Sequence, residues 1–148
     1  MASISLTTRL LVTGPDGTEV EFDYHNKQVT GLTAYSATWH RFSGSDTITV
    51  FDPTNDNLNP ILDFDFLYIY AKTGNVDVEF TCNEGNANEA LSVVRVVAGV
   101  PLVLGADDSI YGTAANQGLT GGSADVIDKI RILDVSAAAN DVLVLLAT

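Results

Sequence analysis

The residues able to do chemistry in this chain are few and widely spaced. Nucleophilic catalysis needs a hydroxyl or thiol beside a base that a third group orients, and only His25 and His40 offer an imidazole. No Gly-x-Ser-x-Gly motif is present, and Ser43-Gly44-Ser45, close to His40, is better explained as a turn between strands. We therefore predict no catalytic residues and a protein that is not an enzyme.

A pair of carboxylates raises the question of glycoside hydrolysis. Asp63-Phe64-Asp65 places two acids on one face of a strand, and that reaction needs two carboxylates that face one another. Alternating Asp and Phe is also the ordinary pattern of a half-exposed antiparallel strand, with Asp in solvent and Phe in the core. We adopt this ordinary interpretation.

Metal and phosphate ligands do not cluster either. Structural zinc needs grouped Cys and His, whereas this chain has one Cys and two distant His. The Asp and Asn residues between 52 and 57, or Asp107 and Asp108, could supply oxygen to calcium, but neither loop has Asp-x-Asp-x-Asp-Gly spacing. Such side chains commonly bond to nearby backbone in turns. Gly121-Gly122 is not followed by Lys-Ser/Thr. We predict no metal and no cofactor.

The charge balance limits the partners. The 148 residues include 19 acidic and 7 basic side chains, a formal net charge of −12, which argues against the phosphate-neutralising patch of a nucleic-acid binder. The apolar stretch 93–104 is interrupted by Arg95, Gly99 and Pro101 and falls short of the roughly 20 residues of a membrane helix. The first six residues lack a signal-peptide pattern. We expect no nucleic acid, no membrane and no secretory leader.

Strands must position whatever site the chain carries. Apolar residues recur at every second position in runs such as 76–82, and segments such as 66–70 are rich in β-branched and aromatic residues. Gly14-Pro15-Asp16-Gly17 has the residues of a tight reversal, with Gly supplying positive φ. The expected strands are 3–12, 18–24, 36–42, 47–52, 63–72, 76–82, 90–98, 101–105, 129–135 and 141–147.

These strands predict a single domain over residues 1–148. We expect an all-β fold, an antiparallel two-sheet β-sandwich that is jelly-roll-like and has little or no helix. The one cysteine, Cys82, cannot form an intramolecular disulfide, so burial of apolar side chains must stabilise the fold. Cys82 ends the alternating run of 76–82, and we expect it to be a small hydrophobic residue of the core.

Contact surfaces are the remaining candidates for function. Trp39-His40-Arg41-Phe42 mixes aromatic and basic character, and alternate members face opposite sides of a strand. Burial is the commoner fate of a lone Trp and the one we expect, while an exposed Trp39 would anchor an interface or stack on sugar. The Gly/Ala/Asn/Ser-rich stretch 105–122 is a candidate contact loop, with a merely mobile loop as the alternative. The interface candidates are Trp39, Arg41, Asp107, Asp108, Ile110, Tyr111 and Leu119.

Two C-terminal stretches carry a resemblance. One is Gly99-Val100-Pro101-Leu102-Val103-Leu104-Gly105-Ala106-Asp107-Asp108-Ser109. The other is Ile127-Asp128-Lys129-Ile130-Arg131-Ile132-Leu133-Asp134-Val135, followed by Asn140-Asp141-Val142-Leu143-Val144-Leu145-Leu146-Ala147. They resemble small jelly-roll or sandwich proteins of tailed-phage virions, which decorate or cement a capsid or sit as accessory proteins on a tail.

The resemblance implies a non-enzymatic bacteriophage structural protein in the virion, on the capsid surface or tail, made in the host cytoplasm. It implies a homo-oligomer, with a trimer favoured, that binds the major capsid protein or other virion proteins. The apolar strand 141–147 is a natural element for pairing with a neighbour, unless it is buried in its own sheet. The alternative function is a carbohydrate- or ligand-binding β-sandwich module that uses Trp39 or Tyr35 as a stacking platform.

Overall fold

The computed structural model describes residues 2–6, 9–13, 15, 17, 19–23, 27–54, 66–82, 89–105, 127–136 and 138–148. Their side chains are described for 3–5, 15, 17, 32–54, 66–82, 89, 91–104, 127–136 and 138–148. The chain divides into two compact units, Met1–Thr33 and Ala34–Thr148. Every element in the described ranges is a strand, and within them no helical segment could span a bilayer.

The first unit is an antiparallel hairpin of two successive ladders. Its strands are β1 (Ala2–Leu6), β2 (Arg9–Thr13), β3 (Glu19–Asp23) and β4 (Lys27–Leu32). β2 pairs with β3 next to the turn of the hairpin, and β1 pairs with β4 further from that turn. Gly17 has φ +80°, the left-handed conformation that the Gly-Pro-Asp-Gly sequence predicts for this reversal.

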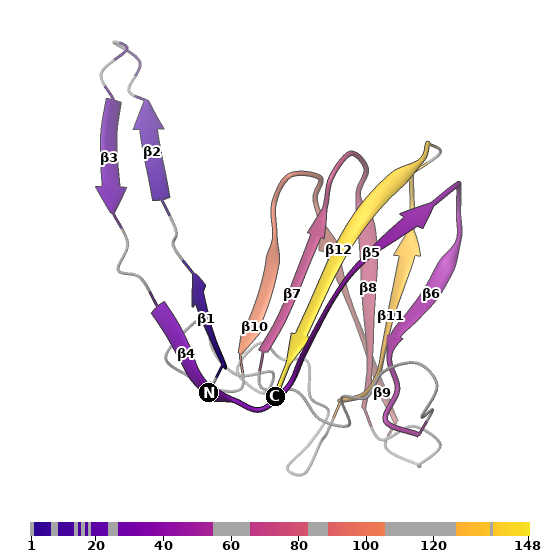
Figure 1. Ribbon diagram of the computed structural model, residues 1–148. Coiled ribbons are helices and arrows are strands. Elements are labelled where there is room, and N and C mark those ends of the chain that lie inside the picture. The colour runs from indigo at the N-terminus through magenta and orange to yellow at the C-terminus, as the bar shows by residue number, and fades with distance from the viewer. Residues whose placement is uncertain are drawn as a thin grey trace. The chain divides into compact units, whose positions relative to one another are not determined.

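The described residues of the second unit form eight strands in two four-stranded antiparallel sheets (Figure 1). Their bounds are β5 (Tyr35–Phe42), β6 (Thr47–Phe51), β7 (Phe66–Ala71), β8 (Val76–Cys82), β9 (Ala90–Val96), β10 (Leu102–Gly105), β11 (Ile127–Asp134) and β12 (Asn140–Ala147). The strand orders are β10-β7-β12-β5 and β6-β11-β8-β9.

The pairing of these eight strands is nested. The first strand, β5, pairs with the last, β12; β6 pairs with β11; β7 pairs with β10; and β8 pairs with β9. This order is that of one long hairpin wrapped into two sheets, which is the jelly roll. The predicted all-β, jelly-roll-like sandwich is therefore confirmed.

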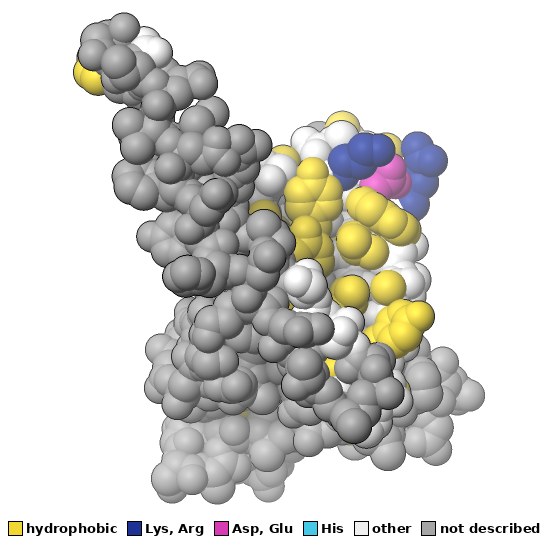
Figure 2. Space-filling view, turned by 60° about the vertical axis from the view of Figure 1, so that its left-hand side comes forward, with side chains coloured by type: hydrophobic (Ala, Val, Ile, Leu, Met, Phe, Trp, Pro, Cys, Tyr) yellow, Lys and Arg dark blue, Asp and Glu magenta, His cyan; other side chains and the backbone are white. Residues whose placement is uncertain are grey.

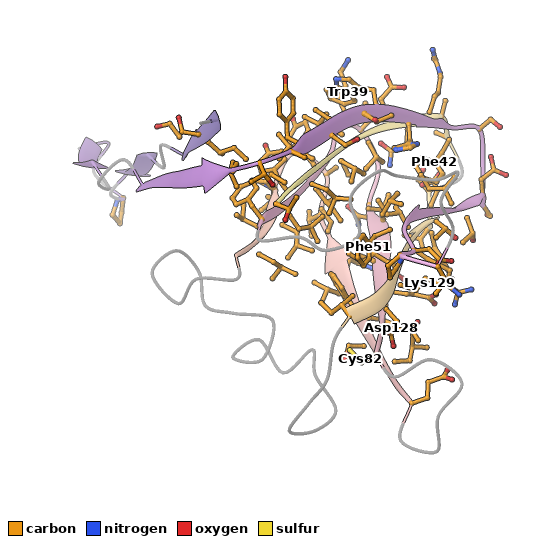
Figure 3. The ribbon with its side chains drawn as sticks, turned by 60° about the horizontal axis from the view of Figure 1, so that its bottom comes forward. Trp39, Phe42, Phe51, Cys82, Asp128 and Lys129 are labelled. Atoms are coloured by element: carbon orange, nitrogen blue, oxygen red, sulfur yellow. The ribbon has the colours of Figure 1, made fainter. Side chains whose placement is uncertain are left out.

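The core lies between the two sheets. Alternate residues of the central strands β8, β11 and β12 are buried, as the two-residue period of a strand requires. Phe42, Phe51 and Phe80 are almost completely buried, and Figure 3 shows Phe42 and Phe51 on the inside of the sandwich. Cys82 is fully buried in the same cluster, as predicted. Burying one large apolar side chain contributes roughly 1.5–3 kcal/mol, so this layer supplies most of the stability.

The sandwich strands agree with the sequence prediction within a few residues at each end. The hairpin agrees less well, because the expected strand 3–12 contains two strands, β1 and β2, and β4 was not expected. The sequence of β4, Lys-Gln-Val-Thr-Gly-Leu, has little apolar alternation and includes Gly31, so propensity alone does not indicate a strand. β4 is held by its ladder with β1.

A buried amide fastens one end of the sandwich. Asn140 is 1% exposed, and its Oδ1 accepts from the N–H groups of Thr73 and Gly74 and from the Thr73 hydroxyl, at 3.1–3.2 Å. Its Nδ2 donates to the Gly74 carbonyl oxygen at 2.9 Å. The β7–β8 turn is thereby joined to the start of β12, 66 residues away in sequence. A satisfied amide of this kind fixes the turn in one conformation.

Candidate interaction surface

The outer face of the β10-β7-β12-β5 sheet is apolar and aromatic. Strand register places Trp39, Leu143 and Tyr70 in one row across β5, β12 and β7. The next row contains Leu145 and Tyr68. We define the aromatic face as the outward residues of this sheet, namely Tyr35, Ala37, Trp39, Arg41, Tyr68, Tyr70, Val103, Asp141, Leu143 and Leu145.

Several members of the aromatic face are open to solvent. Trp39 is 55% exposed and Tyr35 67% exposed, while the tyrosines of β7 and the leucines of β12 are half-buried. Figure 3 shows Trp39 on the outer side of β5, opposite Phe42. Figure 2 shows apolar side chains gathered over these strands. Contiguous exposed apolar surface of this kind marks an interaction site more often than chance, since solitary exposed residues are the norm.

Charge is confined to one end of the aromatic face. The Arg41 guanidinium Nε lies 3.8 Å from Asp141 Oδ1, and Lys72 follows β7 at the same end, with its N–H bonded to the Asp141 carbonyl oxygen. These three residues sum to +1 in a chain whose net charge is −12. Burial and the neighbouring Tyr70 raise the pKa of Tyr68, so the Tyr68 phenol is neutral at physiological pH. The aromatic face therefore carries little of the negative charge that, on the rest of the surface, repels other copies of the chain.

The outer face of the other sheet is built differently. Arg95 forms a bidentate pair with Asp77 across β9 and β8, with N–O distances of 2.7 and 2.8 Å. Arg131 Nη2 of β11 lies 2.6 Å from Glu79 Oε2 of β8. The pairing with Arg95 lowers the pKa of Asp77 through its hydrogen bond. Cross-strand ion pairs are typical of a sheet face that remains in water.

The structure brings two predicted interface residues together and leaves five unplaced. Trp39 and Arg41 both lie on the aromatic face, two positions apart on β5. Trp39 is exposed, so the expectation that it is buried in the core is wrong. Its neighbour Phe42 occupies the core instead. The candidates Asp107, Asp108, Ile110, Tyr111 and Leu119, with the 105–122 loop, lie outside the described residues, apart from Gly105 at the end of β10.

Of the two alternatives for residues 141–147, burial within their own sheet is the one that the structure shows. These residues form β12, which lies between β7 and β5 and has both edges hydrogen-bonded within its own sheet. The free edges of this sheet belong to β5 and β10. What β12 presents to solvent is therefore a face of the sheet and not an edge.

Sequence reasoning missed the aromatic face beyond β5. A signal was present, because Val142 to Leu146 is an unbroken apolar run and Leu67 to Tyr70 is apolar or aromatic at every position. A run without alternation indicates a strand covered on both faces. The inward residues of both strands are buried in the core, which leaves Leu143, Leu145 and the two tyrosines for the outside.

The polar side chains considered as ligands or as members of a reaction centre have local roles where the structure describes them. Within them, no three His, Cys, Asp or Glu side chains gather as a metal site. Ser43 and Asp46 form a turn, as predicted, in which Asp46 Oδ2 accepts from the Ser43 N–H and hydroxyl at 3.3 Å. Asp52 Oδ1 accepts from the Thr54 N–H and hydroxyl, the local backbone role expected of it. Asp63 and Asp65 lie outside the described residues.

Comparison with known proteins adds little. No protein-family model matches the chain, and no curated protein matches it. ToxT from Vibrio cholerae O395, bound to (E)-4-(8-methylnaphthalen-1-yl)but-3-enoic acid, superposes with a TM-score of 0.41 at 12% identity, covering 78% of this chain but only 31% of ToxT. Drosophila melanogaster CENP-C bound to CAL1 gives 0.40 at 14% identity, covering 97% of this chain and 81% of that one. The Drosophila CENP-C cupin domain gives 0.37 at 12% identity, covering 97% and 75%.

Proposed function

We propose that this protein is a non-enzymatic structural protein of a bacteriophage virion, a decoration or cement protein that oligomerises and binds the capsid shell. The observation that carries the proposal is the aromatic face, an apolar sheet surface with exposed aromatic side chains. The outer face of the other sheet carries cross-strand ion pairs beside the exposed Leu91 and Val93. The jelly roll is a fold that viral capsid proteins use, among others, so it is compatible with this role without demanding it.

The aromatic face supports assembly on energetic grounds. Association through Trp39 and Tyr35 removes two strongly exposed aromatic groups from water, and such residues dominate the energy of protein interfaces. The aromatic face has two charged residues, Arg41 and Asp141, with Lys72 beside it. Packing this face against another copy therefore avoids most of the repulsion between chains of net charge −12. The virion and trimer assignments rest on the sequence resemblance.

The test is the mass of the protein in solution with paired substitutions. Replacing Trp39 and Leu143 by Ser should dissociate the oligomer to monomer in native mass spectrometry and light scattering. The matched control replaces Leu91 and Val93 by Ser on the other sheet, where these residues are 56% and 53% exposed. The control should remain oligomeric and should sediment with virus heads that lack the protein. A wild-type protein that is monomeric and does not bind heads contradicts the proposal.

A carbohydrate-binding module is the second candidate, and one observation favours it. Trp39 and Tyr35 are the two most exposed aromatic groups among the described side chains, and they lie on the same side of β5. Four residues of a strand span about 13 Å, so two rings at this spacing form a platform for successive sugars of a chain. Titration with oligosaccharides, followed by Trp39 fluorescence, should then show saturable quenching. An unchanged spectrum with a panel of glycans would eliminate this candidate.

A further inference from the structure

A cleft opens between the two sheets on the side where β5 and β6 form their edges. Its volume is about 140 Å³. The polar part of the lining is Ser36, Thr38, His40 and Thr49, and the aliphatic part includes Val144 and Leu146. The cleft lies on the inner side of β5 and is therefore separate from the aromatic face, which uses the alternate residues of the same strand.

The residues of β5 that line the cleft are unusual for their position. Ser36, Thr38 and His40 face inward, and their register partners on β12 are Leu146, Val144 and Val142. The inward residues of β7, and those of β12 after Asn140, are aliphatic, as the inner face of a sandwich normally is. Three successive polar residues at inward positions on one strand replace apolar contacts that would have stabilised the core. Because β5 is an edge strand, these three residues lie where the cleft opens to solvent.

These polar groups have no protein partner among the described residues. The hydrogen bonds of the described side chains include none from the hydroxyls of Ser36, Thr38 and Thr49, and none from the His40 imidazole. Thr38 is exposed, and Ser36, His40 and Thr49 are half-buried, so all four polar side chains are within reach of water or of a ligand. The cleft therefore presents donors and acceptors to whatever occupies it.

Among the described residues that line the cleft, none is charged. Burial lowers the pKa of His40, so its imidazole is neutral near pH 7 and offers one donor and one acceptor. A charged ligand would lose hydration here without gaining a counter-charge. The hydroxyls of Ser36, Thr38 and Thr49 match a neutral ligand that both donates and accepts.

The edge of β6 is shaped by a β-bulge at the cleft. Register moves from Phe51 opposite Ile130 to Thr49 opposite Arg131, so Val50 is an extra residue on β6. Both Val50 and Phe51 are buried as a result, instead of alternating. Bulges redirect side chains beside binding sites, and this one adds Val50 to the aliphatic lining.

We infer that this cleft binds a small, uncharged, polyhydroxylated molecule, with the chemistry of a monosaccharide ring. Its hydroxyls would bond to Ser36, Thr38, Thr49 and His40, and its C–H groups would contact Val144 and Leu146. The size agrees, because an apolar cavity of roughly 150 Å³ holds benzene, a six-membered ring. The inference does not depend on the proposed virion role or on sugar stacking at Trp39.

The test is a titration of the full-length protein monitored by amide chemical shifts. The probes are glucose, galactose and ribose, their methyl glycosides, cyclohexanol with a single hydroxyl, and sodium acetate as a charged molecule. We expect saturable shifts in residues 36–40, 49–50 and 144–146 with at least one sugar, and weaker binding of cyclohexanol and acetate. The ligand could be a free sugar or the terminal residue of a glycan, and the methyl glycosides distinguish the two. A methyl glycoside that binds as tightly as its free sugar indicates the terminal residue of a glycan. A methyl glycoside that binds more weakly indicates a free sugar.

Substitutions then locate the site. Thr38→Val is nearly isosteric and removes one hydroxyl, so it should weaken the sugar at least tenfold, and His40→Phe should do the same. Thr47→Val is the matched control, because Thr47 is exposed on β6 outside the cleft, and it should leave the affinity unchanged. The inference is overturned if no sugar produces chemical-shift changes that saturate at tens of millimolar, because the cleft then holds only water. It is equally overturned if cyclohexanol binds as tightly as the sugars, or if Thr38→Val and His40→Phe have no effect.

Discussion

The side chain of Asn140 and the backbone of Gly74 form a reciprocal pair of hydrogen bonds. Asn140 Nδ2 donates to the Gly74 carbonyl oxygen at 2.9 Å, and Asn140 Oδ1 accepts from the Gly74 N–H at 3.1 Å. The amide thus completes the β7–β8 turn much as a neighbouring strand would complete a ladder. Because Asn140 begins β12, the turn and the central strand of the other sheet are ordered together.

Replacing Asn140 by Ala should destabilise the protein by about 2 kcal/mol, because several backbone groups of the turn lose their partner in a buried place. Chemical denaturation measures the change. Asn75→Ala is a graded control, since Asn75 Oδ1 accepts a single bond, from the Ala98 N–H at 3.0 Å, and should cost about 1 kcal/mol. Equal losses in the two variants would contradict this account.

A methyl group at residue 74 should be tolerated only if Ser136 gives way. A Cβ added to Gly74 would lie 2.6 Å from Ser136 Cβ and 2.7 Å from its Oγ. Gly74→Ala should therefore cost roughly 1–3 kcal/mol through overpacking. Adding Ser136→Gly removes both atoms, so the double variant should lose less stability than the sum of the two single variants. Additive losses in denaturation experiments would refute the steric explanation.

Cys82 should be unreactive in the native protein. Its side chain is fully buried in the core beside Phe80, and a thiol reagent cannot reach it without opening of the sandwich. The labelling rate with a chromogenic disulfide should be very low in buffer and should rise with denaturant in parallel with global unfolding. Rapid labelling in buffer would mean that this end of the core opens locally.

His40 should make stability depend on pH below neutrality. Burial lowers its pKa from the ordinary 6.5, so between the two values the unfolded chain binds more protons than the native protein. The free energy of unfolding should therefore fall as the pH drops through 6.5 and level off below the native pKa. His40→Gln removes this component, and subtracting its profile from that of the wild type cancels the titration of His25. Superimposable profiles would show that His40 is not desolvated.

Trp39 is the one tryptophan of the chain, which makes it a direct reporter of the aromatic face. With 55% of its surface exposed, it should emit like a water-accessible indole and be quenched by acrylamide in the monomer. On assembly through this face the emission should shift to the blue and the quenching should fall at least severalfold. Emission that is already blue-shifted and protected in a monomer would contradict the exposed placement.

The sandwich could be predicted from the sequence because local pattern and global fold agree there. Alternation in 76–82 gives the inward and outward residues of β8 directly, and Ser43-Gly44-Ser45 marks the turn between β5 and β6. The nested order of strands could not be obtained in the same way. It depends on which distant segments pair, such as β5 with β12, and the residue types along either strand do not encode the partner.

The candidate surface was predictable only in part. Trp39 stood out by residue type, but its fate depended on which side of β5 faces the other sheet. That choice is made by Phe42, which lies at the opposite parity and fills the core. Asn140 gave no signal either, because an isolated Asn before a strand is an ordinary turn residue in sequence. Asn140 stabilises the fold through its hydrogen bonds to the turn at Gly74, and only the tertiary fold brings this turn close to it.

The β5–β12 ladder also governs when the protein can fold. It joins the first and last strands of the sandwich, so the β10-β7-β12-β5 sheet cannot close until β12 has left the ribosome. Until then β5 and β7 have no central strand between them, and their apolar residues remain available to wrong partners. Folding dominated by such distant pairings takes milliseconds to seconds, long enough for collisions between nascent chains to compete. The time at which β12 emerges during synthesis therefore affects how much of the nascent protein aggregates.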